Sequence, residues 1–396
     1  MLRPMKSWPI AAVGIAAILT LCAFAVRRVA FLLATLAPPH PQRPQTGELP
    51  TISLVVPAHD EAAAIDGLLR ALERIDYPHE RRSIVLVDDG STDGTGTRLE
   101  AWAAGRPEVT VLRLPARQGK YEALNRGVGA GAYSELIAVC DSDLLPHADW
   151  LRRLVEPFED EHVGAAAAYL RPANADRTLV AGYGAVESWV NQLVTSSAKD
   201  RLGLRPPTLG AAAYRRTALE QLGGFADGAP GGDIRISLAL ARLGWDTCFV
   251  RAAVVDNLVV EQLGDYWHQH LRWARNLFSS RRGGADAPAL PVLLRLEEWA
   301  VSAGYVDRLA LAAVLALGVF EELPLWVAAA YLTIVAVEVV VAVAKAGAAR
   351  RLPRYLVATA ALSGLDVVAS LAASVAHLFR RPRVWRQPRR GSGWSG

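Results

Sequence analysis

Several residue types and motifs that define common protein classes are scarce or missing in this 396-residue chain. Its three cysteines, Cys22, Cys140 and Cys248, are spaced for neither a disulfide scaffold nor a zinc knuckle. Its histidines, His270 among them, are not spaced as zinc ligands. The chain has no Gly-x-Ser-x-Gly elbow, no Walker loop and no Gly-x-Gly-x-x-Gly fingerprint. These absences count against a disulfide-rich domain, a serine hydrolase, a P-loop NTPase and a dehydrogenase.

Charge of one sign is not in large excess either. The formal net charge is +4, and the densest basic run is the tail 380–396, which follows an apolar segment. A basic run in that position is typical of a membrane surface, so we expect no nucleic-acid partner. With 52% hydrophobic and 21% charged residues and a mean hydropathy of +0.19, the composition indicates a soluble domain joined to a few strongly apolar segments.

The apolar segments lie towards both ends of the chain. Trp8 to Val26 contains no charge and is long enough to span a bilayer, so we expect residues 1–37 to form an N-terminal transmembrane anchor. A cleaved signal peptide is the alternative, but basic rather than small residues follow the run. Further apolar runs predict about three transmembrane helices within 299–379. Glu338 and Asp366 lie inside these runs, and acids in such positions usually face a protein interior or a water-filled path.

Between the apolar ends the chain is ordinary in polarity. Residues 38–50 are rich in proline and are predicted to form a linker. Short runs rich in β-branched residues predict strands at 51–57, 83–87, 109–114 and 136–140, and apolar residues at helical spacing predict a helix over 61–75. Strands that alternate with helices predict an α/β domain with a mostly parallel, doubly wound sheet.

Acidic residues follow two of these strands. Asp88 and Asp89 come after the second, and Asp141 and Asp143 come after the fourth. In such sheets ligands bind at the carboxyl ends of the strands, and two acid clusters at one edge repel each other unless a cation lies between them. Mg²⁺ or Mn²⁺ with the phosphates of a substrate fits this need, and an extended Asp141-Ser142-Asp143 segment would point both acids to one side. The plainer alternative is that an acid such as Asp93 caps a helix.

Six short motifs follow one another through the module. They are VVPAHDE (55–61), VDDGSTDGT (87–95), GKYEALNRG (119–127), DSD (141–143), LGAAAYRR (209–216) and QHLRW (269–273). In these motifs the chain resembles the family-2 glycosyltransferases of GT-A fold, in their processive, membrane-integrated branch. That branch includes the cellulose, hyaluronan, chitin and poly-N-acetylglucosamine synthases and the chitooligosaccharide synthases. The resemblance implies a Rossmann-like GT-A catalytic domain over 51–285, flanked by transmembrane helices.

The resemblance also implies a donor site for a UDP-sugar. A carboxylate of the first acid pair would accept from the uracil or the ribose, Lys120 would approach the uracil or the diphosphate, and Asp143 would hold the metal with Asp141. The donor-binding positions are Pro57, Ala58, Glu61, Asp88, Asp89, Lys120, Asp141 and Arg272.

An inverting transfer needs a base that removes the proton of the acceptor hydroxyl. By resemblance this base is Asp233, but Gly232 stands where the family has a glutamate, so the rate or the acceptor can differ from the family norm. The plain alternative is that Asp233 caps the helix that follows it.

The QHLRW segment carries the remaining contacts. Arg272 is a permanent cation that would grip the leaving diphosphate. Trp273 would stack on a sugar ring, with Gln269 and Gly210 also in the acceptor site. The surrounding helix, 262–282, is aromatic and basic and is predicted to lie on the membrane surface.

These expectations combine into one function with two alternatives. The first is a metal-dependent hexosyltransferase of the plasma membrane, multi-pass and with a cytoplasmic catalytic domain, that extends a β-linked polysaccharide. Because few membrane helices make a narrow conduit, this function can require an oligomer or an accessory export subunit. The alternatives are a single transfer to a membrane lipid, and a catalytically inactive synthase subunit with glycine at position 232 in place of the acid. The sugar and the linkage are not readable, and N-acetylglucosamine is expected only from the overall resemblance.

Overall fold

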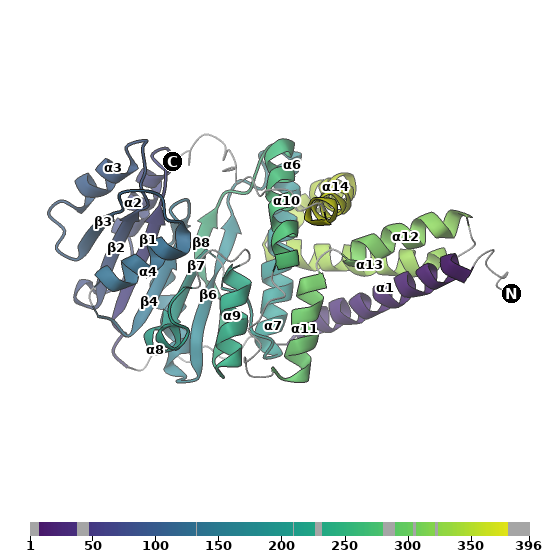
Figure 1. Cartoon of the computed structure of the whole chain (residues 1–396), viewed down its shortest axis with the longest axis horizontal. Coiled ribbons are helices and arrows are strands. Elements are labelled where there is room, and N and C mark those ends of the chain that lie inside the picture. Colours follow the sequence, from purple (N-terminus) through teal and green to yellow (C-terminus); the bar gives the residue numbers. More distant parts are fainter. Residues whose placement is uncertain are drawn as a thin grey trace.

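An eight-stranded sheet forms one side of the molecule, and long helices extend away from its other side (Figure 1). The computed structural model describes residues 8–37, 47–131, 133–208, 210–225, 232–279, 290–303, 306–320 and 324–378. The predicted tail at 380–396 and most of the predicted linker at 38–50 lie outside these residues.

Half of the sheet is parallel, and it is the half that the sequence predicts. The strands are β1 (Ile52–Ala58), β2 (Arg82–Asp88), β3 (Val109–Arg113) and β4 (Leu136–Cys140), in the order β3-β2-β1-β4. Every residue of β1 and β4 is buried, which explains why these runs are apolar without alternation. The expected α/β architecture is confirmed.

The other half of the sheet, in the order β7-β6-β8-β5, is mixed. Its strands are β5 (Leu145–Pro146), β6 (Val163–Pro172), β7 (Ala211–Arg215) and β8 (Asp246–Asn257). β7 is antiparallel to both β4 and β6, whereas β8 is parallel to β6. Alanines dominate the contact of β6 with β7, with Ala166 paired to Ala213 and Ala167 to Ala212. Alanine is a weak strand former, so burial between neighbouring strands rather than intrinsic preference makes these segments extended.

Short helices cover the sheet. They are α2 (Ile65–Glu73), α3 (Thr95–Ala103), α4 (Lys120–Ala130), α5 (Trp150–Val155), α6 (Leu179–Trp189), α7 (Ser197–Arg201), α8 (Arg216–Gln221) and α9 (Gly232–Arg242); a π-helical stretch, Val190–Ser196, joins α6 to α7, and 3₁₀ turns lie at His79–Arg81, Glu156–Glu159 and Ala349–Arg351. The predicted helix over 61–75 is present but shorter, as α2. Gly94, at φ +93°, holds the N-cap position of α3, and the Asp93 carboxylate accepts the N–H of Thr95, the first residue of that helix, at 3.0 Å, so Asp93 supports the helix start from one position earlier than a standard cap.

The apolar segments are helices that pack on one another. They are α1 (Trp8–Ala34), α12 (Val306–Phe320), α13 (Leu325–Lys345) and α14 (Leu352–Leu378), with α10 (Leu263–Ser279) and α11 (Val292–Ala303) between them and the sheet (Figure 1). Within the described residues, three helices are long and apolar enough to cross a membrane: α1, α13 and the stretch Ala349–Ala373. A fourth candidate is a pair, Val292–Val301 and Val306–Val319, bent by 64°.

The two arginines after the first apolar run do not end its helix. α1 continues through Arg27 and Arg28 to Ala34, and both side chains point into the helix bundle. Arg27 binds Glu297 through two hydrogen bonds of 2.8 and 2.7 Å, and Arg28 pairs with Asp307 at 3.0 Å and with Glu338. Glu338 is 3% exposed, so the expectation that it faces a protein interior is confirmed.

Candidate active site

A lysine and an aspartate meet at the carboxyl edge of the parallel strands. Lys120 is the first residue of α4, Asp141 follows β4, and the Lys120 Nζ lies 2.6 Å from the Asp141 Oδ1. The two side chains are 35% and 31% exposed, so this pair is open to a ligand. The structure thus brings together two of the predicted donor-binding residues that are 21 positions apart in the sequence.

Asp89 explains why Lys120 lies at this edge. Its backbone N–H donates to the carbonyl of Ala58 at 2.8 Å, which joins β2 to the end of β1. Its carboxylate accepts the N–H groups of Gln118 at 2.6 Å and Gly119 at 2.9 Å. Because these residues directly precede α4, Asp89 holds the helix start that carries Lys120. At 3% exposure, Asp89 is a buried support of the site.

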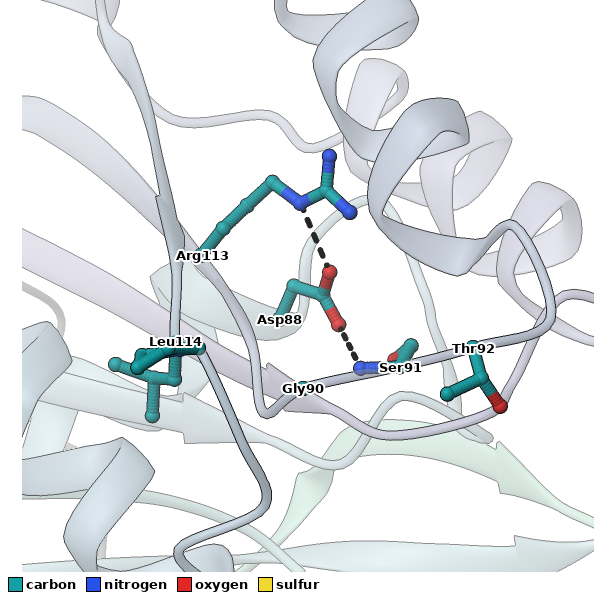
Figure 2. A pocket seen from close by; sticks show the side chains of 7 residues that line it. Asp88, Gly90, Ser91, Thr92, Arg113 and Leu114 are labelled. Atoms are coloured by element: carbon teal, nitrogen blue, oxygen red, sulfur yellow. Dashed lines mark hydrogen bonds and ion pairs between the residues drawn. The ribbon is translucent and has the colours of Figure 1, made fainter.

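Asp88 lies in a neighbouring pocket of about 390 Å³ (Figure 2). Its carboxylate accepts the Ser91 N–H at 2.9 Å and faces the Arg113 Nε at 3.2 Å. The lining residues are Asp88, Gly90, Ser91, Thr92, Arg113, Leu114 and Pro115. Arg113 and Ser91 were not predicted as binding residues, because Arg113 is the last residue of β3 and Ser91 lies in the VDDGSTDGT motif, in which only acids were expected to bind the donor.

The DSD segment is a turn rather than an extended stretch. The N–H of Leu144 donates to the carbonyl of Asp141 at 3.2 Å, which closes a four-residue turn, so the expected alternation of an extended segment is wrong. Gly210 packs on this turn, and the Asp141 N–H donates to its carbonyl at 2.9 Å. A Cβ at position 210 would lie 2.4 Å from the Asp141 Oδ2, so a glycine is required for the carboxylate to stay where it is.

The chemistry of this turn fits a hard divalent cation. Asp141 and Asp143 supply carboxylate oxygens, and both residues are partly exposed at the sheet edge. Oxygen ligands of this kind, completed by substrate phosphates, suit Mg²⁺ and Mn²⁺. The Lys120 ammonium already balances one negative charge of the pair, as expected where acids converge.

The other predicted residues of the donor site have different surroundings. Pro57 and Ala58 are buried in β1, so only their backbone can face a ligand at the strand end. The N–H of Glu61 donates to the Thr95 hydroxyl at 2.9 Å. Asp233 lies in the first turn of α9, and its side chain is outside the described part of the structure.

Two of the predicted acceptor residues, Gln269 and Trp273, lie on α10, as does Arg272 of the predicted donor site. Gln269 and Arg272 are half-buried, whereas Trp273 is 43% exposed, so the helix presents a polar, partly open face at this point. Burial lowers the pKa of Arg272 from its usual value of 12.5. α10 packs on α14 and α6.

A buried cluster behind these residues was not foreseen. The ligand atoms of Glu187, His270 and Asp366 all lie within 4.8 Å of one another, in an arrangement that could hold a metal ion. The residues come from α6, α10 and α14, so no spacing in the sequence could reveal them. Burial raises the pKa of Glu187, and the neighbouring His270 and Arg308 oppose this rise.

The sheet and its carboxyl edge lie in a part of the chain that is similar to known proteins. Residues 53–223 match the model of glycosyl transferase family 2. This segment is therefore similar to the domains of family-2 glycosyltransferases. The matched residues include nearly all of β1, the strands β2 to β7, the Lys120–Asp141 pair and Gly210, but not β8. A solved mannosyltransferase from Pyrobaculum calidifontis, in complex with GDP-mannose and Mn²⁺, is similar over 94% of this chain and 99% of its own, with 25% identity and a TM-score of 0.65. The GT-A fold is therefore confirmed.

Relatives of the domain carry more than one activity. An N-acetylglucosaminyltransferase of Rhizobium meliloti is 29% identical over 59% of this chain and 57% of its own length. A β-monoglucosyldiacylglycerol synthase of Trichormus variabilis is 32% identical over 60% of this chain and 51% of its own. The chain spans about half of the length of the curated relatives it matches.

Proposed function

We propose that the chain is an inverting glycosyltransferase at a membrane. It transfers a hexose or an N-acetylhexosamine from a nucleotide-diphosphate sugar, with UDP as the carrier, to the end of a growing β-linked polysaccharide. The observation that carries the proposal is the open Lys120–Asp141 pair at the sheet edge, with Gly210 packed against the carboxylate. This edge combines a cation and acids, as the recognition of a diphosphate with its metal requires.

Asp141 and Asp143 would hold Mg²⁺ or Mn²⁺. When bound, the ion offsets the charge that develops on the leaving diphosphate. The protein's own contribution is to fix these carboxylates: the turn at Asp141 is closed by Leu144, and Asp89 orients the start of α4, from which Lys120 reaches Asp141.

The proposed transfer balances around the acceptor oxygen. The Asp233 carboxylate takes the proton of the acceptor hydroxyl, the oxygen forms a bond to the anomeric carbon, and the bond from that carbon to the diphosphate breaks with its electron pair leaving on the diphosphate. Attack from the face opposite the leaving group inverts the configuration. Arg272 would bind the departing diphosphate, because a guanidinium is a permanent cation whose N–H groups match phosphate oxygens, and Trp273 would stack on the acceptor sugar.

The decisive test measures sugar transfer by the full chain in membranes. Radiolabelled UDP-N-acetylglucosamine, UDP-glucose and GDP-mannose are supplied in turn with Mn²⁺ or Mg²⁺. Product retained on a filter supports a polymer, with Asp233→Asn as the inactive control. Incorporation from GDP-mannose alone would contradict the UDP donor, and no incorporation from any donor would contradict the enzyme.

A lipid acceptor is the second candidate, and one relative favours it directly: the matched synthase of Trichormus variabilis is named for a glycolipid product. The three helices that can cross a membrane, with the bent pair, offer an acceptor close to the bilayer in either case. A single organic-extractable product in the same assay would establish this function in place of the polymer.

The same helices motivate the proposed location, a multi-pass protein of the plasma membrane with its catalytic domain in the cytoplasm. The cytoplasm supplies nucleotide sugars, and the apolar helices lie on the side of the molecule away from the sheet edge (Figure 1). Labelling of single cysteines introduced at exposed positions such as Glu80 tests the orientation. Labelling by an impermeant reagent in intact cells would contradict it.

A further inference from the structure

A second group of charged residues lies where the helix α10 meets the apolar helices. Asp366, at 0% exposure, is at its centre, on a helix that is long and apolar enough to cross a membrane. We name this group the Asp366 cluster; its members are Tyr183 and Glu187 of α6, Tyr266 and His270 of α10, Arg308 of α12 and Asp366 of α14.

Two tyrosines and an arginine bind the Asp366 carboxylate. The Tyr183 hydroxyl donates to its Oδ2 at 2.7 Å, and the Tyr266 hydroxyl donates to its Oδ1. The Arg308 Nη1 lies 2.5 Å from Oδ2. A carboxylate that receives donors from three separate helices fixes the relative positions of those helices, because each hydrogen bond is lost if one helix slides or rotates.

Glu187 of α6 and His270 of α10 lie next to Asp366 and complete the cluster. The His270 Nε2 lies 3.3 Å from the Glu187 Oε2, and its Nδ1 lies 3.4 Å from the Asp366 Oδ1. The Tyr266 ring stacks on the His270 ring with 3.9 Å between centroids. The Tyr266 hydroxyl is hydrogen-bonded to both Asp366 and Glu187, whereas the His270 Nδ1 only faces Asp366 and makes no hydrogen bond.

His270 links this cluster to the predicted acceptor residue. Its ring centroid lies 4.9 Å from that of Trp273. The chain of contacts runs from Asp366 through Tyr266 and His270 to Trp273, and Arg272 is the adjacent residue on the same helix. A shift of α10 would move Arg272 and Trp273 with it.

The charges in the cluster favour a structural role over a metal ion. Arg308 already compensates Asp366, and the Tyr266 hydroxyl lies between the two carboxylates, 3.1 Å from the Glu187 Oε2. A cation would have to displace these donors from both carboxylates.

We propose that Asp366 is a positioning residue: from the membrane helix α14 it sets the place of α10, and so of Arg272 and Trp273, through Tyr266 and His270. This inference rests on the proposed function, because it assigns those two residues to the donor and the acceptor. It means that the apolar helices take part in building the site rather than only anchoring it.

The experiment compares Asp366→Asn with a matched control, Asp176→Asn, in the purified full chain. Asp176 also holds the C-terminal helix, through the Tyr355 hydroxyl at 2.9 Å and through Arg351, but neither partner lies on α10. We expect Asp366→Asn to lower kcat by about 10- to 100-fold, since small misplacements of reacting groups have effects of this size. Asp176→Asn is expected to keep the wild-type kcat.

A double-mutant cycle separates positioning from general damage. If Asp366 acts through α10, adding Asp366→Asn to Trp273→Ala lowers kcat far less than it does in the wild type. Full additivity, or a wild-type kcat in a folded Asp366→Asn, overturns the proposal. Tyr266→Phe keeps the ring stack and the arginine pair, and provides the same comparison, with a smaller expected loss, if Asp366→Asn does not fold.

Two further readouts do not depend on activity. Amide hydrogen exchange over 263–279 is expected to rise in Asp366→Asn and to stay unchanged in Asp176→Asn; equal exchange in both variants overturns the positioning role even if the enzyme proposal fails. Elemental analysis of the wild type is expected to find no metal bound at this cluster. One equivalent of metal, retained in Asp143→Asn but lost in both Asp366→Asn and His270→Gln, would instead assign a metal site.

Discussion

The sheet edge around Asp141 and the Asp366 cluster both gather acids around a cation, but they differ in access. The Lys120 and Asp141 side chains are about one-third exposed, whereas Asp366 is fully buried and Arg308 is 29% exposed. Exposed charges can exchange their partners for a ligand at little cost, whereas buried charges must keep theirs. An open ion pair therefore suits substrate binding, and a closed one suits fixed geometry.

The two regions also differ in how the chain builds them. The sheet edge is assembled from segments that follow consecutive parallel strands, so its residues lie in short motifs. The Asp366 cluster draws its members from α6, α10, α12 and α14, with up to 183 positions between hydrogen-bonded partners. Changes in the first region should affect chemistry more than stability, and changes in the second should affect both.

The largest expected effect is the loss of transfer in Asp143→Asn. Removing a carboxylate that would hold the metal is expected to lower the transfer rate about 1,000-fold, since metal stabilisation of developing charge contributes several kcal/mol. The rate is measured with the labelled donor at saturating Mn²⁺. Asp66→Asn, which only breaks an exposed pair with Arg98, is the control and should keep the wild-type rate. A rate near that of the wild type in Asp143→Asn would show that Asp143 does not hold a metal that the reaction requires.

Among the buried pairs, Glu297→Gln is expected to have the largest effect on stability. Glu297 compensates both Arg27 and Lys199, with Lys199 at 2.8 Å and 9% exposed. Without its charge, two cations stay in the bundle, and the free energy of unfolding should fall by about 3–5 kcal/mol. Thermal unfolding in detergent measures the change in the free energy of unfolding. Asp66→Asn, which breaks only an exposed ion pair, should change this free energy by less than about 0.5 kcal/mol. An equal fall in the free energy of unfolding in both variants would show that burial does not determine how much an ion pair contributes to stability.

The sequence predicts the sheet edge around Asp141 better than the Asp366 cluster, because local sequence patterns encode the strands that form this edge. β1, β2, β3 and β4 are rich in β-branched and apolar residues, and the acids stand at the end of β2 and directly after β4. By contrast, the alanine-rich strands β6 and β7 have no strand signal of their own and depend on pairing with each other. The turn at Asp141 was also missed, since it is closed by a backbone hydrogen bond that no residue type requires.

The buried ion pairs among the apolar helices are predicted only in part. An acid inside an apolar run, such as Glu338 or Asp366, indicates a buried partner but does not say which residue it is. Arg28 and Arg308 are those partners, and they lie 310 and 58 positions away. His270 carries no local signal at all, because its role depends on residues from two other helices.

A smaller effect is expected from Gly210→Ala. The added Cβ would lie 2.4 Å from the Asp141 Oδ2, so the carboxylate must turn away. We expect the Mn²⁺ concentration needed for half-maximal transfer to rise about tenfold, equivalent to about 1.4 kcal/mol. Gly129→Ala is the matched control: nothing lies within 4 Å of its added Cβ, and it should leave the metal dependence unchanged. A rise of the same size in both variants would rule out the contact with Asp141 as its cause.

The smallest effect is expected from a change at Asp93, which joins the loops after β1 and β2. Burial opposes the ionisation of Asp93, but hydrogen bonds from the Thr95 hydroxyl and the N–H groups of Ala62 and Thr95 outweigh it and lower the pKa of Asp93 below 3.8. Asp93→Ala should therefore lower stability by about 0.5–1 kcal/mol at pH 7, where the wild-type carboxylate is charged in both states. A depressed folded pKa contributes stability above the unfolded pKa and loses it as the pH falls through the folded pKa. The difference in Tm between the wild type and Asp93→Ala should consequently shrink below about pH 4, and a difference that stays constant with pH would mean that the charge of Asp93 does not stabilise these loops.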